Sequence, residues 1–145
     1  MLSMLPNLDD LLKYKNENIL LRYQKDYPHA KMPAHEALSE LLKYIWLCCK
    51  HALDFKHSPD QEALQFSCIM HEEMIEIDYM WHTFLLFTRD YLSFCQTYLS
   101  GDFFHHQPKV DKKSVDENNI YELQRYLAYI YDQLGEDTLT KWFKV

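Results

Sequence analysis

Glycine is nearly absent from this chain, and its scarcity constrains the fold more than any other feature of the sequence. The 145 residues include only two glycines, Gly101 and Gly135, and five prolines. β-Hairpins and Gly-rich phosphate-binding loops need glycine at positions that other residues disfavour, whereas long stretches without glycine or proline favour helices. Of these 145 residues, 48% are hydrophobic, which is enough apolar surface to form a buried core. We therefore predict an all-α fold, a single-domain bundle of five to seven helices over residues 1–145.

The N-terminal third of the chain contains clear helix boundaries. A first helix is expected to begin after Pro6 with Asn7 as its cap, to be interrupted by the polar residues 15–18, and to end before Pro28. A second helix is expected over residues 33–53, where apolar side chains recur at helical spacing and form one stripe. The length of that stripe predicts that this helix is the central one.

The middle of the chain contains further helix signals. Residues 58–61, Ser-Pro-Asp-Gln, have the order of a capping box with proline in the first turn, which predicts the start of a helix. Two helices are expected over residues 71–87 and 88–100, with Thr88 as the cap of the second and Gly101 just beyond its end. Because this cap and this stop delimit the second helix, we expect the two to form an antiparallel hairpin.

A further helix is expected over residues 115–134, after a second capping box at residues 114–117, and Asp137 is expected to cap a short final helix. The buried face of helix 115–134 is predicted to contain Ile120, Leu123, Leu127, Ile130 and Leu134. Tyr126 and Tyr129 lie off that stripe, and tyrosine is enriched at protein interfaces. We therefore expect the protein to associate with a partner or with a second copy through this helix.

The charge of the chain excludes one class of partner. The formal net charge is −7, whereas binding to nucleic acid phosphates requires clustered Lys and Arg. The longest apolar runs are also far shorter than the ~20 residues of a membrane span. The sequence thus predicts no nucleic acid and no membrane as a partner, and its acidity suits a protein partner.

The cysteines indicate a reducing compartment. The four are Cys48, Cys49, Cys68 and Cys95, and no Cys-x-x-Cys motif is present. Free, buried thiols are the expected state, and residues 1–10 show no secretory signal. These features predict a cytoplasmic location, although secretion without a cleavable signal leaves no trace in a sequence.

The clearest chemical pattern lies on the helix predicted at residues 71–87. His71, Asp78 and His82 are spaced by seven and four residues, which places them on one side of a helix. Glu76 and its acidic neighbours fall elsewhere on the helix and are expected to be solvated. Asp78 and His82 alone are explained equally well by an aspartate that orients a histidine.

Three residues beyond this helix extend the pattern. If residues 88–106 fold back, Cys95 and His105 or His106 converge on Asp78 and His82 in a mixed site of O, N and S atoms. Zinc accepts such a set with four ligands. The predicted metal ligands are therefore Asp78, His82, Cys95, His105 and His106, with zinc as the cofactor. A hydrogen-bonded structural network of the same side chains is the other interpretation, and it is favoured because no adjacent pair has the spacing of a zinc finger.

The stretch from Asp78 to Pro108 resembles a helical domain known from plant glycine-rich-domain proteins and from small bacterial proteins. The shared residues are Asp78, Trp81, His82 and Phe84, then Thr88, Tyr91, Phe94, Cys95 and Gly101, and finally the sequence His105-His106-Gln107-Pro108. The chain lacks the glycine-rich region of the plant proteins, so it looks more like the bacterial members. The resemblance implies an all-helical fold and a constellation shared by Asp78, Trp81, His82, Cys95, His105 and His106, but it implies no reaction.

Together these observations predict a small acidic helical protein that acts by binding a protein, as a regulatory or inhibitory module. Cys95 and His82 could form a nucleophile–base pair in principle, but the apolar neighbours of Cys95 predict a buried thiol, whereas a catalytic thiol must be exposed. No His-Glu-x-x-His motif is present in the sequence. The alternative function is that of a metal-dependent enzyme that uses Asp78, His82, His105 and His106 at an open metal site. An accessible pocket at His82 favours the enzyme, and an exposed apolar patch favours the binding module.

Overall fold

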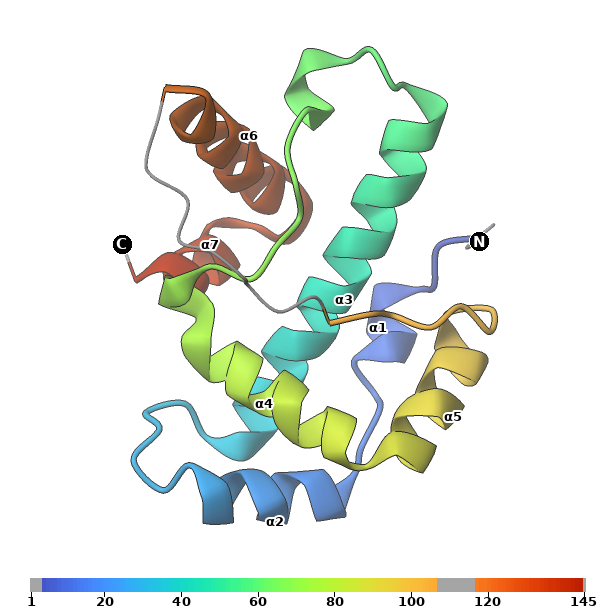
Figure 1. The fold of residues 1–145 in the computed structure, drawn as a ribbon, viewed down its shortest axis with the longest axis vertical. Helices are drawn as coiled ribbons and strands as arrows, with labels where there is room; N and C mark the ends of the chain where they lie inside the picture. The colour runs from blue at the N-terminus through green and yellow to red at the C-terminus, as the bar shows by residue number, and fades with distance from the viewer. Residues whose placement is uncertain (1–3, 107–116, 145) are drawn as a thin grey trace.

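The computed structural model of the protein describes residues 4–106 and 117–144, and it confirms the all-α prediction (Figure 1). The helices of these residues are α1 (Leu8–Leu11), α2 (Glu17–Asp26), α3 (Ala34–His57), α4 (Ile75–Leu86), α5 (Thr88–Tyr98), α6 (Glu117–Leu134) and α7 (Glu136–Phe143). Two short 3₁₀ helices, Glu62–Leu64 and Glu72–Met74, lie between α3 and α4. No strand occurs in the part of the chain that the structure describes.

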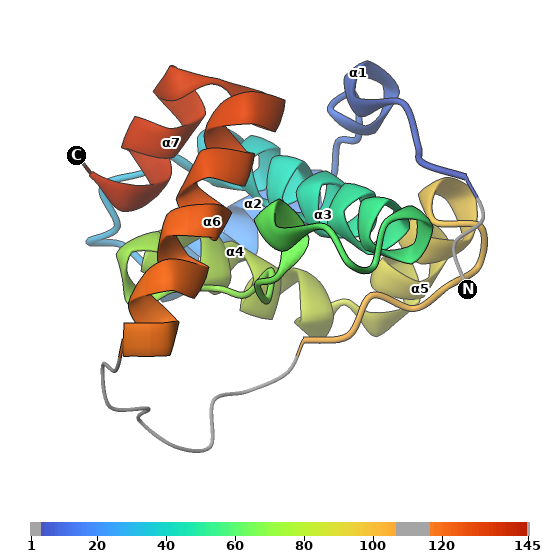
Figure 2. The same ribbon diagram turned by 90° about the horizontal axis from the view of Figure 1, so that it is seen from above.

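Helix α3 is central, as the sequence predicts. Figure 2 shows it running through the middle of the molecule, with α6 and α7 on one side and α1 and α5 on the other. Its apolar stripe is buried from the first turn as far as Cys49, for example at Leu38, Leu41 and Ile45, whereas Ala52 nearer the end of the helix is exposed. None of the helices within 4–106 and 117–144 combines the length and apolar character that a membrane span requires.

The predicted interruption of the first helix is confirmed. Asn7 caps α1 by accepting a hydrogen bond from the backbone N–H of Asp10 at 3.1 Å, and Asn16 caps α2. The chain between them turns Tyr14 inward, where its ring stacks on Phe84 with centroids 5.6 Å apart. The polar residues thus divide one amphipathic stretch into two helices that both pack on the core.

The helix predicted to start at residues 58–61 is wrong. Only the 3₁₀ helix Glu62–Leu64 forms there, and the chain then runs extended to His71. The side-chain amide of Gln65 donates to the carbonyl oxygens of Pro59 and Gln61 at 2.7 and 3.2 Å, so these acceptors are occupied without a helical backbone. The extended stretch allows Phe66 to pack between α3 and α6, where it is 7% exposed.

The predicted antiparallel hairpin of α4 and α5 is also wrong. Phe87 alone connects the two helices, and Thr88 is the first residue of α5 rather than a side-chain cap. Contacts between them lie close to this junction, where the ring of Phe84 meets Tyr91 and Phe94. Figure 1 shows α5 leaving the end of α4 at a steep angle instead of lying along it.

The surface tyrosines predicted on α6 are buried. Tyr126 and Tyr129 are 1% and 7% exposed, whereas Ile120, predicted to be buried, is 46% exposed. The hydroxyl of Tyr126 donates to the carbonyl oxygen of Ile69 at 2.9 Å, and that of Tyr129 donates to Asp54 at 2.6 Å. Because each phenol satisfies its polar group in this way, both rings contribute to the core. The predicted capping box at residues 114–117 extends outside the described residues.

Candidate metal centre

The first two side chains of the candidate site come from α4. Asp78 and His82 are one helical turn apart, and Asp78 Oδ2 lies 3.5 Å from His82 Nε2. The side chain of Asp78 is 16% exposed and that of His82 is 48% exposed. The i, i+4 spacing therefore places both groups on one face, with the carboxylate toward the protein and the imidazole at the surface.

The third side chain, His106, reaches α4 because the chain reverses after α5. Ser100 and Gly101 both have positive φ values, of 57° and 86°, and the following segment runs back toward α4 (Figure 1). The hydroxyl of Tyr91 holds this segment by donating to the carbonyl oxygen of Phe104. The same hydroxyl accepts a hydrogen bond from the indole N–H of Trp81 at 3.1 Å.

Trp81 is the platform on which the returning segment lies. Its ring stacks on that of Phe104 with centroids 5.2 Å apart, and its centroid is 4.3 Å from that of the His106 imidazole. Trp81 is 4% exposed. A buried indole of α4 thus fixes the direction from which His106 approaches Asp78.

The donor atoms of Asp78, His82 and His106 converge on one region. His106 Nε2 lies 2.7 Å from Asp78 Oδ1 and 3.1 Å from His82 Nε2, and one donor atom from each residue lies within 4.8 Å of the others. Ligand atoms around a tetrahedral zinc ion are separated by about 3.3 Å, given zinc–nitrogen bonds of about 2.0–2.1 Å. The observed separations bracket that value, so small side-chain movements suffice to surround an ion.

The same three contacts also describe a hydrogen-bond network. A neutral imidazole has one N–H and one acceptor nitrogen. His106 Nε2–H donates to Asp78 in one tautomer, and the lone pair of His82 Nε2 then faces the same hydrogen. Both alternatives that the sequence suggested, a metal site and a structural network, therefore involve these three residues.

Two of the predicted ligands lie outside this group. Cys95 is 1% exposed, and burial raises the pKa of its thiol. His105 is exposed and its ring packs against Phe103, with centroids 4.6 Å apart. Because adjacent residues of an extended segment point in opposite directions, His106 faces α4 while His105 faces away.

His71 is also separate from the group. It precedes the 3₁₀ helix Glu72–Met74 rather than lying on α4. Its ring packs near those of Tyr126 and Phe143, with centroids 5.4 and 5.6 Å away. His71 shares a face with Asp78 only on one continuous helix from residue 71, and α4 begins at Ile75, after the 3₁₀ helix.

Glu76, expected to be solvated, holds a neighbouring connection in place. Its carboxylate accepts hydrogen bonds from the backbone N–H groups of Lys31 and Met32 at 2.7 and 3.0 Å. These residues belong to the segment between α2 and α3. Residue spacing along α4 could not predict this contact, because the backbone N–H groups that donate to Glu76 lie about 45 residues earlier in the chain.

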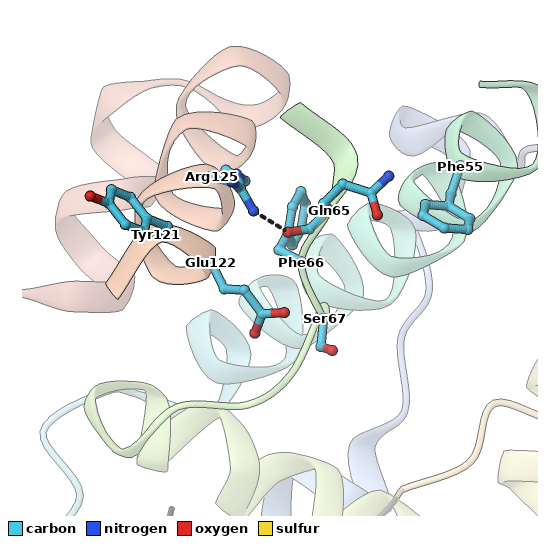
Figure 3. A pocket seen from close by; sticks show the side chains of 7 residues that line it. All are labelled: Phe55, Gln65, Phe66, Ser67, Tyr121, Glu122 and Arg125. Atoms are coloured by element: carbon cyan, nitrogen blue, oxygen red, sulfur yellow. Dashed lines mark hydrogen bonds between the residues drawn. The ribbon is translucent and has the colours of Figure 1, made fainter. Parts of the chain in front are cut away.

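Two surface pockets among the described residues are lined by side chains other than the metal-ligand candidates. The larger pocket, of about 510 Å³, is shown in Figure 3 and lies between the end of α3, the segment 65–67 and the first turns of α6. Arg125 reaches across it to the carbonyl oxygen of Gln65 at 3.1 Å. Phe55 stands at one side of the pocket and Glu122 at the other.

Comparison with known proteins yields one match. The family model described as UCP032817-like matches residues 10–133, which is most of the chain. The resemblance to the helical domain of glycine-rich-domain proteins is therefore wrong, because it relied on residues 78–108 alone. Neither the search of curated proteins nor the search of solved structures returned a match.

Proposed function

We propose that this chain, which belongs to the UCP032817-like family, is a helical binding domain that holds a divalent metal ion with Asp78, His82 and His106. The observation that supports this proposal is the convergence of one carboxylate and two imidazole donor atoms within 4.8 Å. Two imidazoles with one carboxylate suit zinc and other first-row divalent ions. We take zinc as the ion to test first.

The proposed role of the metal is to fasten the segment 102–106 to α4. Asp78 and His82 are fixed by the helix, whereas His106 belongs to a segment without regular structure. A metal ion that binds only the folded arrangement stabilises it by mass action. In this proposal the metal adds to the anchoring that Trp81, Phe104 and Tyr91 already supply.

A protein partner is the proposed target of the domain. Support comes from two exposed apolar side chains that line the larger pocket: Phe55 is 39% and Tyr121 is 48% exposed. Large exposed aromatic and aliphatic groups near a concave surface are typical of interaction sites. The partner surface therefore lies at the α3–α6 side, not on the tyrosines that the sequence suggested.

A metal-dependent enzyme is the second candidate, favoured by the ligand number. Three protein ligands leave a coordination position for water or substrate, which is the pattern of catalytic rather than structural zinc sites. His82 is nearly half-exposed, so that position is accessible from solvent. The exposed apolar side chains at the larger of the two pockets favour the binding domain over the enzyme.

Metal analysis tests the proposal directly. Protein purified without a chelator or a metal-affinity column is expected to contain about one equivalent of metal by elemental analysis, and the His82→Ala variant is expected to contain none. Added zinc should raise the melting temperature of metal-free wild-type protein but not that of His82→Ala. A metal content near zero, together with an unchanged melting temperature after addition of zinc, would show that the three residues form a hydrogen-bond network and not a metal site.

A further inference from the structure

A second pocket, of about 250 Å³, lies on the opposite end of α4 from the candidate metal centre, between α5 and the connection of α1 to α2. Its lining combines one carboxylate, Asp90, with the aromatic rings of Tyr14, Phe94 and Tyr98. Ligand pockets of proteins usually measure roughly 300–1,000 Å³, so this one suits a ligand of a few heavy atoms. The proposed metal site uses none of these residues.

The carboxylate of Asp90 has no cationic partner among the described residues. Its Oδ2 accepts a hydrogen bond from the side-chain amide of Asn16 at 2.9 Å, and no Lys, Arg or His forms an ion pair with it. Asn16 also donates to the Tyr14 hydroxyl at 3.1 Å. Asp90 lies in the first turn of α5, where the helix dipole favours a negative charge.

The aromatic rings form a corner beside this carboxylate. Tyr14 and Tyr98 are at 88° to each other with centroids 6.1 Å apart, and Phe94 lies 5.1 Å from each of them. Tyr14 and Tyr98 are partly exposed, whereas Phe94 is 2% exposed and closes the base of the corner. A tyrosine ring attracts a positive charge that lies over a face left open to the pocket.

We propose that this pocket binds a small organic ammonium ion. The Asp90 carboxylate supplies the opposite charge, and the faces of Tyr14 and Tyr98 supply cation–π contacts. The hydroxyls of Ser93 and Thr97, which also line the pocket, accept hydrogen bonds from a primary ammonium or bind the hydroxyl of an amino alcohol. The net charge of −7 raises the local concentration of cations near the surface.

Primary and quaternary ammonium ions both carry the positive charge that this pocket is proposed to bind, and a titration shows which of them binds. We would titrate the full chain with choline, with n-butylammonium and with 3,3-dimethylbutanol, the neutral isostere of choline, at constant ionic strength. Isothermal calorimetry gives the affinity, and NMR of the tyrosine rings locates the site. At least one cation is expected to bind saturably and shift the Tyr14 and Tyr98 signals, and the neutral alcohol is expected to bind at least about tenfold more weakly.

Two variants make the assignment specific to this pocket. Asp90→Asn keeps the shape and an acceptor for Asn16, and it should weaken cation binding about tenfold or more. Leu92→Ala, on the 48% exposed face of the same helix, should leave the affinity unchanged. Equal binding of the cation and the neutral isostere by wild-type protein overturns the proposal, even if Asp90→Asn fails to fold. Absence of saturable binding by either cation overturns it as well.

Discussion

Trp142 donates its indole N–H to Glu40 Oε1 at 2.8 Å, and both side chains are buried. The other carboxylate oxygen of Glu40 accepts a hydrogen bond from Lys43 at 3.1 Å, and Lys141 lies 3.9 Å away. A buried carboxylate is tolerated only where such donors replace its lost hydration. This contact connects α7 to the second turn of α3.

Replacement of Glu40 should therefore destabilise the protein. Glu40→Ala leaves the indole N–H and the Lys43 ammonium without their acceptor, and we expect a loss of on the order of 3 kcal/mol in the free energy of unfolding. Glu40→Gln keeps an acceptor and should cost less. Denaturant unfolding measures both, with Glu73→Ala on the exposed face as the control. A loss under about 1 kcal/mol for Glu40→Ala would contradict this assignment.

Removal of Trp81 tests the platform under the candidate metal centre. Trp81→Ala should lower the free energy of unfolding by about 3–5 kcal/mol, because a large buried ring is lost and the surrounding structure collapses only partly. The same change removes the surface on which Phe104 and His106 pack. Leu92→Ala, at a position that is 48% exposed, should cost less than about 0.5 kcal/mol. Similar losses for both variants would show that Trp81 does not support this segment.

Helix identity was predictable from the sequence where short-range rules decide it. Asn7 and Asn16 act through atoms three residues away, and the stripe of α3 follows from helical periodicity. The start expected at residues 58–61 was not predictable, because Gln65 provides an alternative donor for the carbonyl oxygens there. Tyr126 was misplaced because its hydroxyl bonds to Ile69, 57 residues earlier in the chain.

The candidate site was also predictable from the sequence only in part. Asp78 and His82 were found by their i, i+4 spacing, which needs only a helix. The choice between His105 and His106 depends on which of two adjacent side chains of the returning segment faces Trp81, and no local rule decides it. Cys95 was included because residues 88–100 were expected to fold back along residues 71–87. Since α5 instead leaves α4 at a steep angle, Cys95 lies in the core.

The two adjacent histidines give a sharp mutational test of metal binding. His106→Ala removes a proposed ligand and should abolish the zinc-dependent rise in melting temperature, whereas His105→Ala should preserve it. A zinc concentration of 100 times Kd adds about 2.7 kcal/mol of stability to the folded state, which calorimetry resolves easily. Equal loss of the zinc response in both variants would indicate a different ligand set from the one proposed.

Asp54 should make the stability of the protein depend on pH in the acid range. Burial raises the pKa of this carboxyl, but hydrogen bonds from Tyr129 and Lys50 outweigh that effect, so its pKa lies below the ordinary value of 3.8. In the unfolded chain the group takes up its proton at higher pH than in the folded chain. The stabilisation is therefore complete above the ordinary pKa and is lost as the pH falls through the lower folded value.

The Asp54→Asn variant isolates this contribution. The Asp54 side chain is 32% exposed, so solvent screening limits the loss on substitution to about 0.5–1 kcal/mol near neutral pH. Urea unfolding of wild-type protein and of the variant should converge as the pH falls from about 5 to about 3. A difference that stays constant over this range would show that Asp54 keeps the same protonation in both states.

The last prediction concerns Glu76, whose side chain was expected to be solvated but contacts the segment between α2 and α3. Its carboxylate accepts two backbone N–H bonds, from Lys31 and Met32, and Tyr27 of the same connection stacks on Tyr79 of α4 with centroids 4.2 Å apart. Glu76→Ala leaves both N–H groups without an acceptor, and we expect a loss of about 1–3 kcal/mol.

Hydrogen exchange localises the effect of this substitution. The amides of Lys31 and Met32 should lose protection from exchange in Glu76→Ala. The exchange rates of amides in the middle of α3 should change only as far as the global stability changes. Glu73→Ala, a neighbouring exposed carboxylate, should change neither stability nor exchange by a measurable amount. If the two variants behave alike, the carboxylate of Glu76 is solvated and the connection between α2 and α3 is held by the tyrosine stack alone.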